Sequence, residues 1–550
     1  MKLSLRLLTV LLLFSSTLFS QRLNKADRNL AARLKTHVTY LADDKLEGRR
    51  AGTEGEKAAR EYISQRFREA GLEPKGENGD WYQPFEIYDG KQVKPSTLFL
   101  INSHDLRLFE DFFPLAYSPN ASLEAAVSPA LKEKDVPWFF DLKDLLDEND
   151  ENPHFDLDGA IKSKAKQAAE KGATAFILYN SSGYQDGMRF NGKDRSETLT
   201  IPVLYITDRA RRQFLSDEMA TLDIRIKVDI GEKNRTGYNV IGYIDNKAPS
   251  TVIIGAHYDH LGYGEDGNSM LRNGEKLVHN GADDNASGTA ALIELARILK
   301  QYKQKNNNYL FIAFSGEELG LNGSRYFTEH PTVPLDKTSY MINMDMVGRL
   351  NDSSKTLTVG GYGTSPAWAQ IFNSFRKNKN LNIRLDSSGT GPSDHTSFYR
   401  KDIPVLFFFT GLHSDYHRPS DDADKINYTG QVQIVRLIEE VVKSAAPLGK
   451  LAFTKTREVQ TSTTARFNVS MGIMPDYTYT GTGVRVDGVS DGRPAQQAGL
   501  KTGDVILQLG NYATSDMEAY MQALGKFKKG EKTTVKYKRG DEVLEAEVVF

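Results

Sequence analysis

Histidine and carboxylate residues recur in the second half of the chain, most of them directly after short apolar runs that read as strands. In an open α/β sheet, side chains just beyond the carboxyl ends of the strands converge on one ligand site. We therefore expect these residues to meet at one edge of a sheet. They fall in five segments: His257-Tyr-Asp259, the loop with Asp283 and Asp284, Glu317-Glu318, Asn343-Met-Asp345, and Tyr416-His417 with Asp421.

Two histidines and several carboxylates can hold two divalent cations, because the carboxylates partly neutralise the metal charge. Nitrogen and oxygen ligands without sulfur suit zinc, cobalt or manganese. Two such metals a few Å apart lower the pKa of a shared water, and a nearby carboxylate that is not a ligand can act as general base. The adjacent Glu317 and Glu318 offer one carboxylate as a metal ligand and one as a general base, since neighbouring residues in a turn point in different directions.

Each signal also has an ordinary structural explanation when it stands alone. A His-x-Asp is usually a surface polar cluster, and a pair of glutamates often complements a helix dipole. An aspartate before Asn-Ala-Ser-Gly can be a helix N-cap. Five such segments in order, most of them following a strand, favour a metal site over coincidence.

Composition narrows the chemistry further. The chain has 550 residues, which predicts three to four domains, and its 39% hydrophobic content supports a substantial core. Lys plus Arg is 70 and Asp plus Glu is 72, so the net charge of -2 gives no global attraction to nucleic acid. Cysteine is absent, which excludes Cys-ligated zinc, iron–sulfur clusters and thiol nucleophiles. Any metal must be held by His, Asp and Glu.

Residues 1–20 are typical of a secretory signal peptide. Lys2 and Arg6 precede an apolar run over residues 7–19, which is too short to span a bilayer, and cleavage is expected near Ser20. The alternative is an uncleaved anchor. We expect a secreted protein, periplasmic or extracellular, with no membrane association after signal cleavage.

The spacing of apolar residues predicts the helices and strands that position the candidate site residues. Residues 29–71 read as two amphipathic helices separated by a Gly- and Arg-rich loop at 46–55, and residues 96–234 read as a block of short strands with one strong helix. From residue 239 onward, predicted strands and helices follow one another as in an α/β sheet. Strands are expected at 239–243, 251–256, 309–315, 340–345 and 403–410, and helices at 286–302 and 428–446.

At these residues the chain resembles the secreted di-zinc aminopeptidase family, whose relatives include glutamate-carboxypeptidase-like proteins and glutaminyl cyclases. The resemblance covers about 29–95 and 238–448. Its motifs are His257-Tyr-Asp259, Asp284-Asn-Ala-Ser-Gly288, Glu317-Glu318-Leu-Gly-Leu-Asn-Gly-Ser324, Asn343-Met-Asp345-Met, Ser393-Asp-His395 and Asp415-Tyr-His417 with Asp421. It implies an α/β catalytic domain of the mixed-sheet, phosphorylase/hydrolase-like zinc-peptidase fold, built from 21–95 and 235–450.

The resemblance implies a centre of two zinc ions, with cobalt or manganese possible. Asp284 would bridge both metals. One metal would add His257 and Asp345, and the other would add Glu318 and His417.

The resemblance also implies catalytic roles. Glu317 would be the general base for the bridging water, and Asp259 would hydrogen-bond the far nitrogen of His257. Tyr416 either steadies an oxyanion or packs the rim of the site. We expect Asp283 to support the loop and His395 to lie outside the ligand set.

Two accessory modules complete the predicted organisation. Residues 96–234 resemble a protease-associated (PA) insert, either a cover that limits substrate size or a purely structural lid. After a linker at 451–466, residues 467–550 resemble a PDZ domain, most clearly at 492–507. Residues 470–473 would be its carboxylate-binding loop and 521–527 its groove helix, although the usual Gly-Leu-Gly-Phe loop is absent. A peptide or protein ligand of this module is therefore one option beside an intramolecular contact.

The favoured function is a secreted metallo-aminopeptidase acting on peptides with a free N-terminus. The alternatives are a glutaminyl cyclase-like acyltransferase or a carboxypeptidase on the same scaffold. A non-catalytic receptor or scaffold is the least favoured, because its expected signature is the loss of ligands.

Overall fold

The computed structural model describes residues 23–149, 155–194, 196–271, 275–375, 380–456, 469–475, 482–489, 492–515 and 517–550. The predicted signal peptide and most of the predicted linker lie outside these ranges. Within them, no helix is long and apolar enough to cross a membrane.

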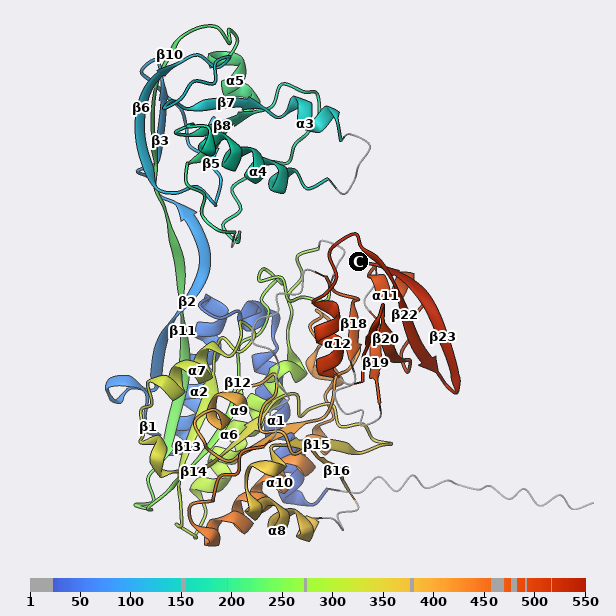
Figure 1. The fold of residues 1–550 in the computed structure, drawn as a ribbon. Helices are drawn as coiled ribbons and strands as arrows, with labels where there is room; N and C mark the ends of the chain where they lie inside the picture. The colour runs from blue at the N-terminus through green and yellow to red at the C-terminus, as the bar shows by residue number, and fades with distance from the viewer. Residues whose placement is uncertain are drawn as a thin grey trace, which may run out of the picture.

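A mixed sheet forms the centre of the molecule (Figure 1). Its order among the described residues is β1-β11-β13-β12-β14-β17-β15-β16, with β2 paired to β11. Four neighbouring strands, β13, β12, β14 and β17, run parallel, so their carboxyl ends share one edge. The strands are β1 (Glu73–Pro74), β2 (Tyr82–Val93), β11 (Ile230–Ile244), β12 (Thr251–His257), β13 (Asn308–Phe314), β14 (Thr338–Met344), β15 (Thr356–Gly360), β16 (Asn382–Leu385) and β17 (Val405–Phe409).

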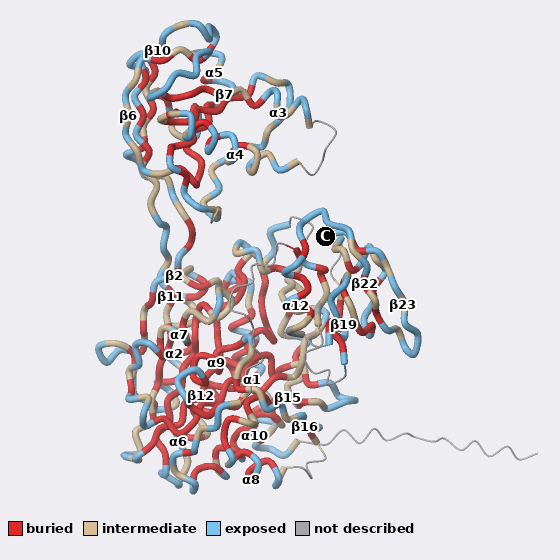
Figure 2. The backbone as a smooth tube through the Cα atoms, in the orientation of Figure 1, coloured by how far each residue is buried: buried red, intermediate tan, exposed pale blue. Residues whose placement is uncertain are grey.

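Helices cover both faces of this sheet, which explains why β12, β13 and β14 are buried along their whole length. Alternate residues serve opposite faces: Ile254 packs in the larger core with α1, α2, α6, α8 and α10, whereas Ile253 packs in a second core with α7 and α9. Burial is concentrated in these layers (Figure 2). The helices are α1 (Lys25–Leu41), α2 (Glu54–Glu69), α6 (Gly288–Lys300), α7 (Asn322–Glu329), α8 (Pro366–Phe375), α9 (His395–Tyr399) and α10 (Tyr428–Ala445).

Short helical turns connect these elements, and two of them border the predicted site. A 3-10 turn, Asp44–Arg49, occupies the Gly- and Arg-rich loop, and the side chain of Thr53 then caps α2 by accepting the N–H of Glu56. A π-helical turn, Ala282–Ser287, precedes α6. The other 3-10 turns are Glu77–Gly79, Leu335–Lys337, Tyr362–Thr364, Ala423–Lys425 and Ala446–Leu448.

Strands β2 and β11 extend beyond the sheet as a two-stranded ribbon that carries the inserted block (Figure 1). The block holds two four-stranded sheets, β4-β3-β10-β6 and β5-β9-β8-β7, around its own cores. Its elements are β3 (Leu98–Ile101), β4 (His104–Asp105), β5 (Phe112–Pro114), β6 (Ala121–Val127), β7 (Trp138–Asp141), α3 (Lys143–Asp147), α4 (Leu157–Glu170), β8 (Phe176–Tyr179), β9 (Val203–Ile206), α5 (Asp208–Phe214) and β10 (Leu222–Val228).

The C-terminal module is an antiparallel sheet with its own apolar core. The helix predicted at 521–527 is α12, which begins earlier, at Met517, and ends at Leu524. The elements are β18 (Ile473–Pro475), β19 (Val484–Val489), α11 (Pro494–Gln497), β20 (Val505–Leu509), β21 (Tyr512–Ala513), α12, β22 (Lys532–Arg539) and β23 (Glu542–Val549). The predicted α/β class with a mixed sheet is confirmed.

Candidate metal centre

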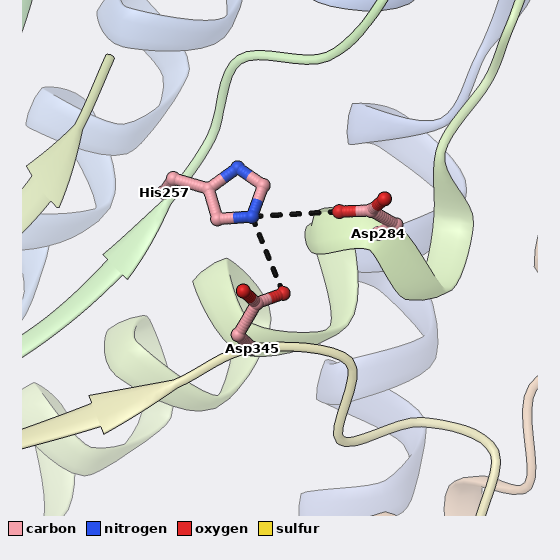
Figure 3. A group of neighbouring side chains, drawn as sticks. All are labelled: His257, Asp284 and Asp345. Atoms are coloured by element: carbon pink, nitrogen blue, oxygen red, sulfur yellow. Dashed lines mark hydrogen bonds and ion pairs between the residues drawn. The ribbon is translucent and has the colours of Figure 1, made fainter. Parts of the chain in front are cut away.

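The shared carboxyl edge of the parallel strands brings three of the predicted ligands together. His257 is the last residue of β12, Asp345 directly follows β14, and Asp284 lies in the turn before α6. The Nε2 atom of His257 is 3.4 Å from Oδ1 of Asp284 and 3.3 Å from Oδ1 of Asp345 (Figure 3). These three side chains form the first ligand group.

A second ligand group lies on the other side of Asp284. The Nε2 atom of His417, from the loop after β17, is 3.3 Å from Oδ2 of Asp284 and 3.2 Å from Oε2 of Glu318. Asp284 thus turns one carboxylate oxygen toward each group.

The spacing between the histidine and each carboxylate in both groups fits tetrahedral coordination. Bonds of about 2.0–2.1 Å from zinc to nitrogen or oxygen place ligand atoms about 3.3 Å from one another. The four separations, from 3.2 to 3.4 Å, match this value. The donors are imidazole and carboxylate, as the absence of cysteine requires, so the residues fit two divalent cations.

The turn that carries Asp284 is held by a buried arginine. Arg49, in the Gly- and Arg-rich loop, is fully buried and donates to the carbonyls of Tyr258, Asn280 and Gly281. Burial lowers the pKa of Arg49 to about 10, although Asp284 and other carboxylates oppose this shift. The sequence marked this loop by its composition, but nothing in it indicated which arginine points inward.

Residues 239–442 match the family described as Peptidase family M28. This region belongs to peptidase family M28. The match contains both ligand groups. Residues 457–549 match the family described as PDZ domain, which confirms the predicted C-terminal module.

Curated relatives match the chain over part of their length. Aminopeptidase YwaD of Bacillus subtilis is 28% identical over 301 residues, covering 52% of this chain and 61% of the relative. Leupeptin-inactivating enzyme 1 of Streptomyces exfoliatus is 30% identical over 193 residues, covering 34% of this chain and 39% of the relative. The chain thus spans less than two thirds of these two relatives.

Two solved structures cover more of the chain at lower identity. BSAP, a zinc aminopeptidase from Bacillus subtilis, is 22% identical with a TM-score of 0.42, covering 78% of this chain and 96% of the other. Glutaminyl cyclase of Porphyromonas gingivalis is 13% identical with a TM-score of 0.38, covering 75% and 97%.

Beside the first ligand group, Asp259 does not make the expected side-chain hydrogen bond to His257. Its carboxylate Oδ1 lies 3.8 Å from Nδ1 of His257, which is too long for a hydrogen bond. The backbone carbonyl of Asp259 lies nearer to this nitrogen, at 3.2 Å, because the chain turns back directly after β12. The carboxylate instead accepts the backbone N–H of Glu317 at 3.2 Å. Asp259 therefore contacts the backbone of the predicted base, and burial raises the pKa of Asp259 to about 8.

Glu317 directly precedes Glu318 and belongs to neither ligand group. Burial raises its pKa well above the usual value, and although His257 opposes this, the charges of Asp345 and Glu318 add to it. A carboxylate that stands beside metal ligands without being one of them can act as a general base.

Two further predicted residues make ring contacts. Tyr416 stacks on the ring of His417, with centroids 3.9 Å apart. His395 is buried and stacks on Phe407, and burial lowers its pKa to about 3. His395 stays outside both ligand groups.

Asp283 belongs to neither ligand group and supports the turn. Its Oδ1 accepts the N–H of Gly348 at 2.6 Å and the hydroxyl of Ser287 at 2.9 Å. His413, which the sequence analysis did not single out, lies 3.3 Å from Oδ2 of Asp283.

His260 was also missed, although it directly follows Asp259. Its Nδ1 lies 2.8 Å from Oε1 of Glu318 and 3.9 Å from Oδ2 of Asp284. With Asp284 and Glu318, His260 forms a group whose possible ligand atoms all lie within 4.8 Å of one another. A second imidazole therefore stands beside the second ligand group, and its position after the His257-Tyr-Asp259 motif was the available signal.

Proposed function

We propose that this chain is a secreted di-zinc aminopeptidase that removes N-terminal residues from peptides. The observation that carries the proposal is the pair of ligand groups that share Asp284, each with the spacing of a tetrahedral site. Membership of family M28 supports peptide hydrolysis, and the names of YwaD and BSAP support an aminopeptidase that uses zinc.

The proposed roles follow from position. The two ligand groups, His257 with Asp284 and Asp345 and His417 with Asp284 and Glu318, would hold two divalent cations, which would polarise the scissile carbonyl and lower the pKa of a bound water. Glu317 accepts the proton of the attacking water and returns it to the leaving amine. The N–H of Glu317 donates to Asp259, which holds the backbone of the base in place. Tyr416, stacked on His417, lies at the second ligand group, where an oxyanion contact is proposed.

The proposed organisation keeps the predicted boundaries. Residues 1–20 direct secretion to the periplasm or the medium, and 21–95 with 235–450 form the catalytic domain. Residues 96–234 form a PA-like insert, and 451–466 link the catalytic domain to a PDZ domain at 467–550 that binds a peptide or protein segment.

The test uses the purified full chain and Glu317→Gln on peptides with free, acetylated or glutaminyl N-termini and with free or amidated C-termini. We expect wild type to trim only free N-termini, whatever the C-terminus, and to bind about two zinc ions. Glu317→Gln should keep both ions and lose roughly 10²–10⁴-fold in kcat. The exposed Glu329→Gln is the matched control and should behave as wild type.

Three outcomes would overturn the proposal. Cyclisation of N-terminal Gln would indicate an acyltransferase, and dependence on a free C-terminus would indicate a carboxypeptidase. Binding of zinc without any cleavage would indicate a receptor or scaffold.

A further inference from the structure

The two oxygens of Glu318 have different partners. Oε2 lies 3.2 Å from Nε2 of His417, within the second ligand group. Oε1 lies 2.8 Å from Nδ1 of His260, and the side chains of His260 and Glu318 are 0% and 6% exposed. The carboxylate is therefore enclosed between two imidazoles.

The distances distinguish a ligand from a hydrogen-bond donor. Ligand atoms around one tetrahedral cation lie about 3.3 Å apart. Nδ1 of His260 is closer than this to Glu318, at 2.8 Å, and farther than this from Asp284, at 3.9 Å. A separation of 2.8 Å is that of a charge-assisted hydrogen bond between a ring N–H and a carboxylate. Because an ionised carboxylate only accepts, Nδ1 of His260 carries the hydrogen.

The imidazole of His260 has little freedom to turn toward a cation. A Cβ atom at Gly281, whose φ is +55°, would lie 2.5 Å from Cδ2 of this ring, so the backbone packs directly on it. The backbone N–H of His260 donates to the carbonyl of Arg49 at 3.2 Å. Both contacts fix the ring with Nδ1 directed at Glu318.

We propose that His260 is a positioning residue of the second metal subsite. It donates Nδ1–H to Oε1 of Glu318 and so would leave Oε2 to bind the cation. This inference rests on the proposed dinuclear site, but not on the reaction performed there. Hydrogen-bond partners of metal ligands typically contribute 10–100-fold to metal affinity.

The test compares His260→Leu with His260→Asn in the full chain. The amide nitrogen of asparagine can stand near the position of Nδ1 and donate in its place, whereas it does not replace an imidazole ligand. His279→Leu is the matched control, because it removes another buried imidazole, one that contacts Ser269 and neither ligand group.

Stepwise zinc dissociation constants are measured by competition with a chromophoric chelator, and the absorption of bound Co²⁺ is recorded. We expect His260→Leu to weaken one of the two constants by roughly 10–100-fold while still binding two ions at saturation. His260→Asn should restore that constant to within about threefold of wild type and keep the Co²⁺ spectrum, and thermal unfolding verifies that each variant is folded.

Equal losses in both variants, or one ion at saturation, would make His260 a ligand and overturn the proposal. Wild-type constants in both variants would overturn it too. These readouts need no peptide cleavage, so a failure of the proposed aminopeptidase function leaves them interpretable.

Discussion

The carboxylate of Asp421 accepts a hydrogen bond from the backbone N–H of Asp284 at 3.0 Å. The same oxygen accepts the N–H of Asp283 at 2.9 Å, and the carbonyl of Asp421 accepts the N–H of Ala282 at 2.9 Å. Three consecutive N–H groups of the turn that carries the shared ligand are thus satisfied by one distant residue. Asp421 fixes where the carboxylate of Asp284 can point.

Asp421→Ala should therefore weaken the binding of both proposed zinc ions, each by roughly 10-fold or more, because Asp284 faces both ligand groups. Zinc competition titration of the purified chain measures the two constants. Asp424→Ala, at an exposed position three residues away, is the control. A loss confined to one ion would contradict the role given to Asp421.

Replacing Arg49 should destabilise the catalytic core more than any surface arginine. Arg49→Met leaves the carbonyls of Leu41, Tyr258, Asn280 and Gly281 without this donor in a buried place. Leaving buried acceptors unsatisfied costs about 1–3 kcal/mol each, so a loss of about 3 kcal/mol or more in the free energy of unfolding is expected.

Tryptophan fluorescence during urea unfolding can measure this loss. In a Trp138→Phe background, the remaining Trp81 and Trp368 both report on the largest core. Arg325→Met, which removes an exposed side chain, is the control. A change below about 1 kcal/mol for Arg49→Met would show that water replaces the guanidinium.

The grouping of the proposed ligands could be predicted from the sequence because its signal is local. His257 and Asp345 stand at the ends of continuous apolar runs, and parallel strands bring such ends to one edge. Helix α6 was predicted to start at residue 286, whereas the structure starts it at Gly288 after a π-helical turn. That turn is held by Asp421 and Arg49, whose partners lie far away in the sequence.

The residues that support the proposed ligands could not be predicted, because their contacts are not local in the sequence. No periodicity indicates that Arg49 contacts Gly281, or that His260 contacts Glu318, since these pairings depend on tertiary packing. The ribbon of β2 and β11 was also not predicted, because its partners are separated by the whole inserted block. Local patterns specified strands and their ends, and long-range contacts specified the geometry.

An ion-pair cluster joins the ribbon, the inserted block and the catalytic region. Asp266 accepts from Nε and Nη2 of Arg50 at 2.7 and 2.8 Å and from Lys193 of the inserted block at 3.1 Å. Burial raises the pKa of Asp266, but the hydrogen bond and charge of Arg50 and the charge of Arg235 outweigh it and hold the pKa well below the usual range.

The lowered pKa of Asp266 makes its contribution to the free energy of unfolding depend on pH. Because the pKa of Asp266 is lower in the folded protein than in the unfolded chain, its contribution is complete above about pH 4 and declines as the pH falls further. Asp266→Asn should cost about 3 kcal/mol near pH 7, and the difference from wild type should shrink below about pH 4. Urea unfolding at several pH values tests this.

The neighbouring Glu265→Gln is the control for Asp266→Asn. Its side chain is 41% exposed and 3.9 Å from Arg50, so it should change stability by less than about 1 kcal/mol at every pH. A difference for Asp266→Asn that persisted at low pH would show that the carboxylate charge is not the source of the effect.

Replacing Asp504 should destabilise the C-terminal module and leave the metal centre intact. Asp504 is buried and accepts two hydrogen bonds from Arg539, at 2.8 and 2.7 Å, and one from the N–H of Lys501 at 2.8 Å. Asp504→Ala removes all three, and in a domain of this size a loss of about 1 kcal/mol lowers the midpoint of thermal unfolding by about 4–8 °C.

Calorimetry of the full chain should show this shift in the transition of the module alone, with zinc content and peptide cleavage unchanged. Asp541→Ala, at an exposed turn of the same module, is the control. Loss of zinc or of cleavage in Asp504→Ala would instead mean that the module and the catalytic region depend on each other.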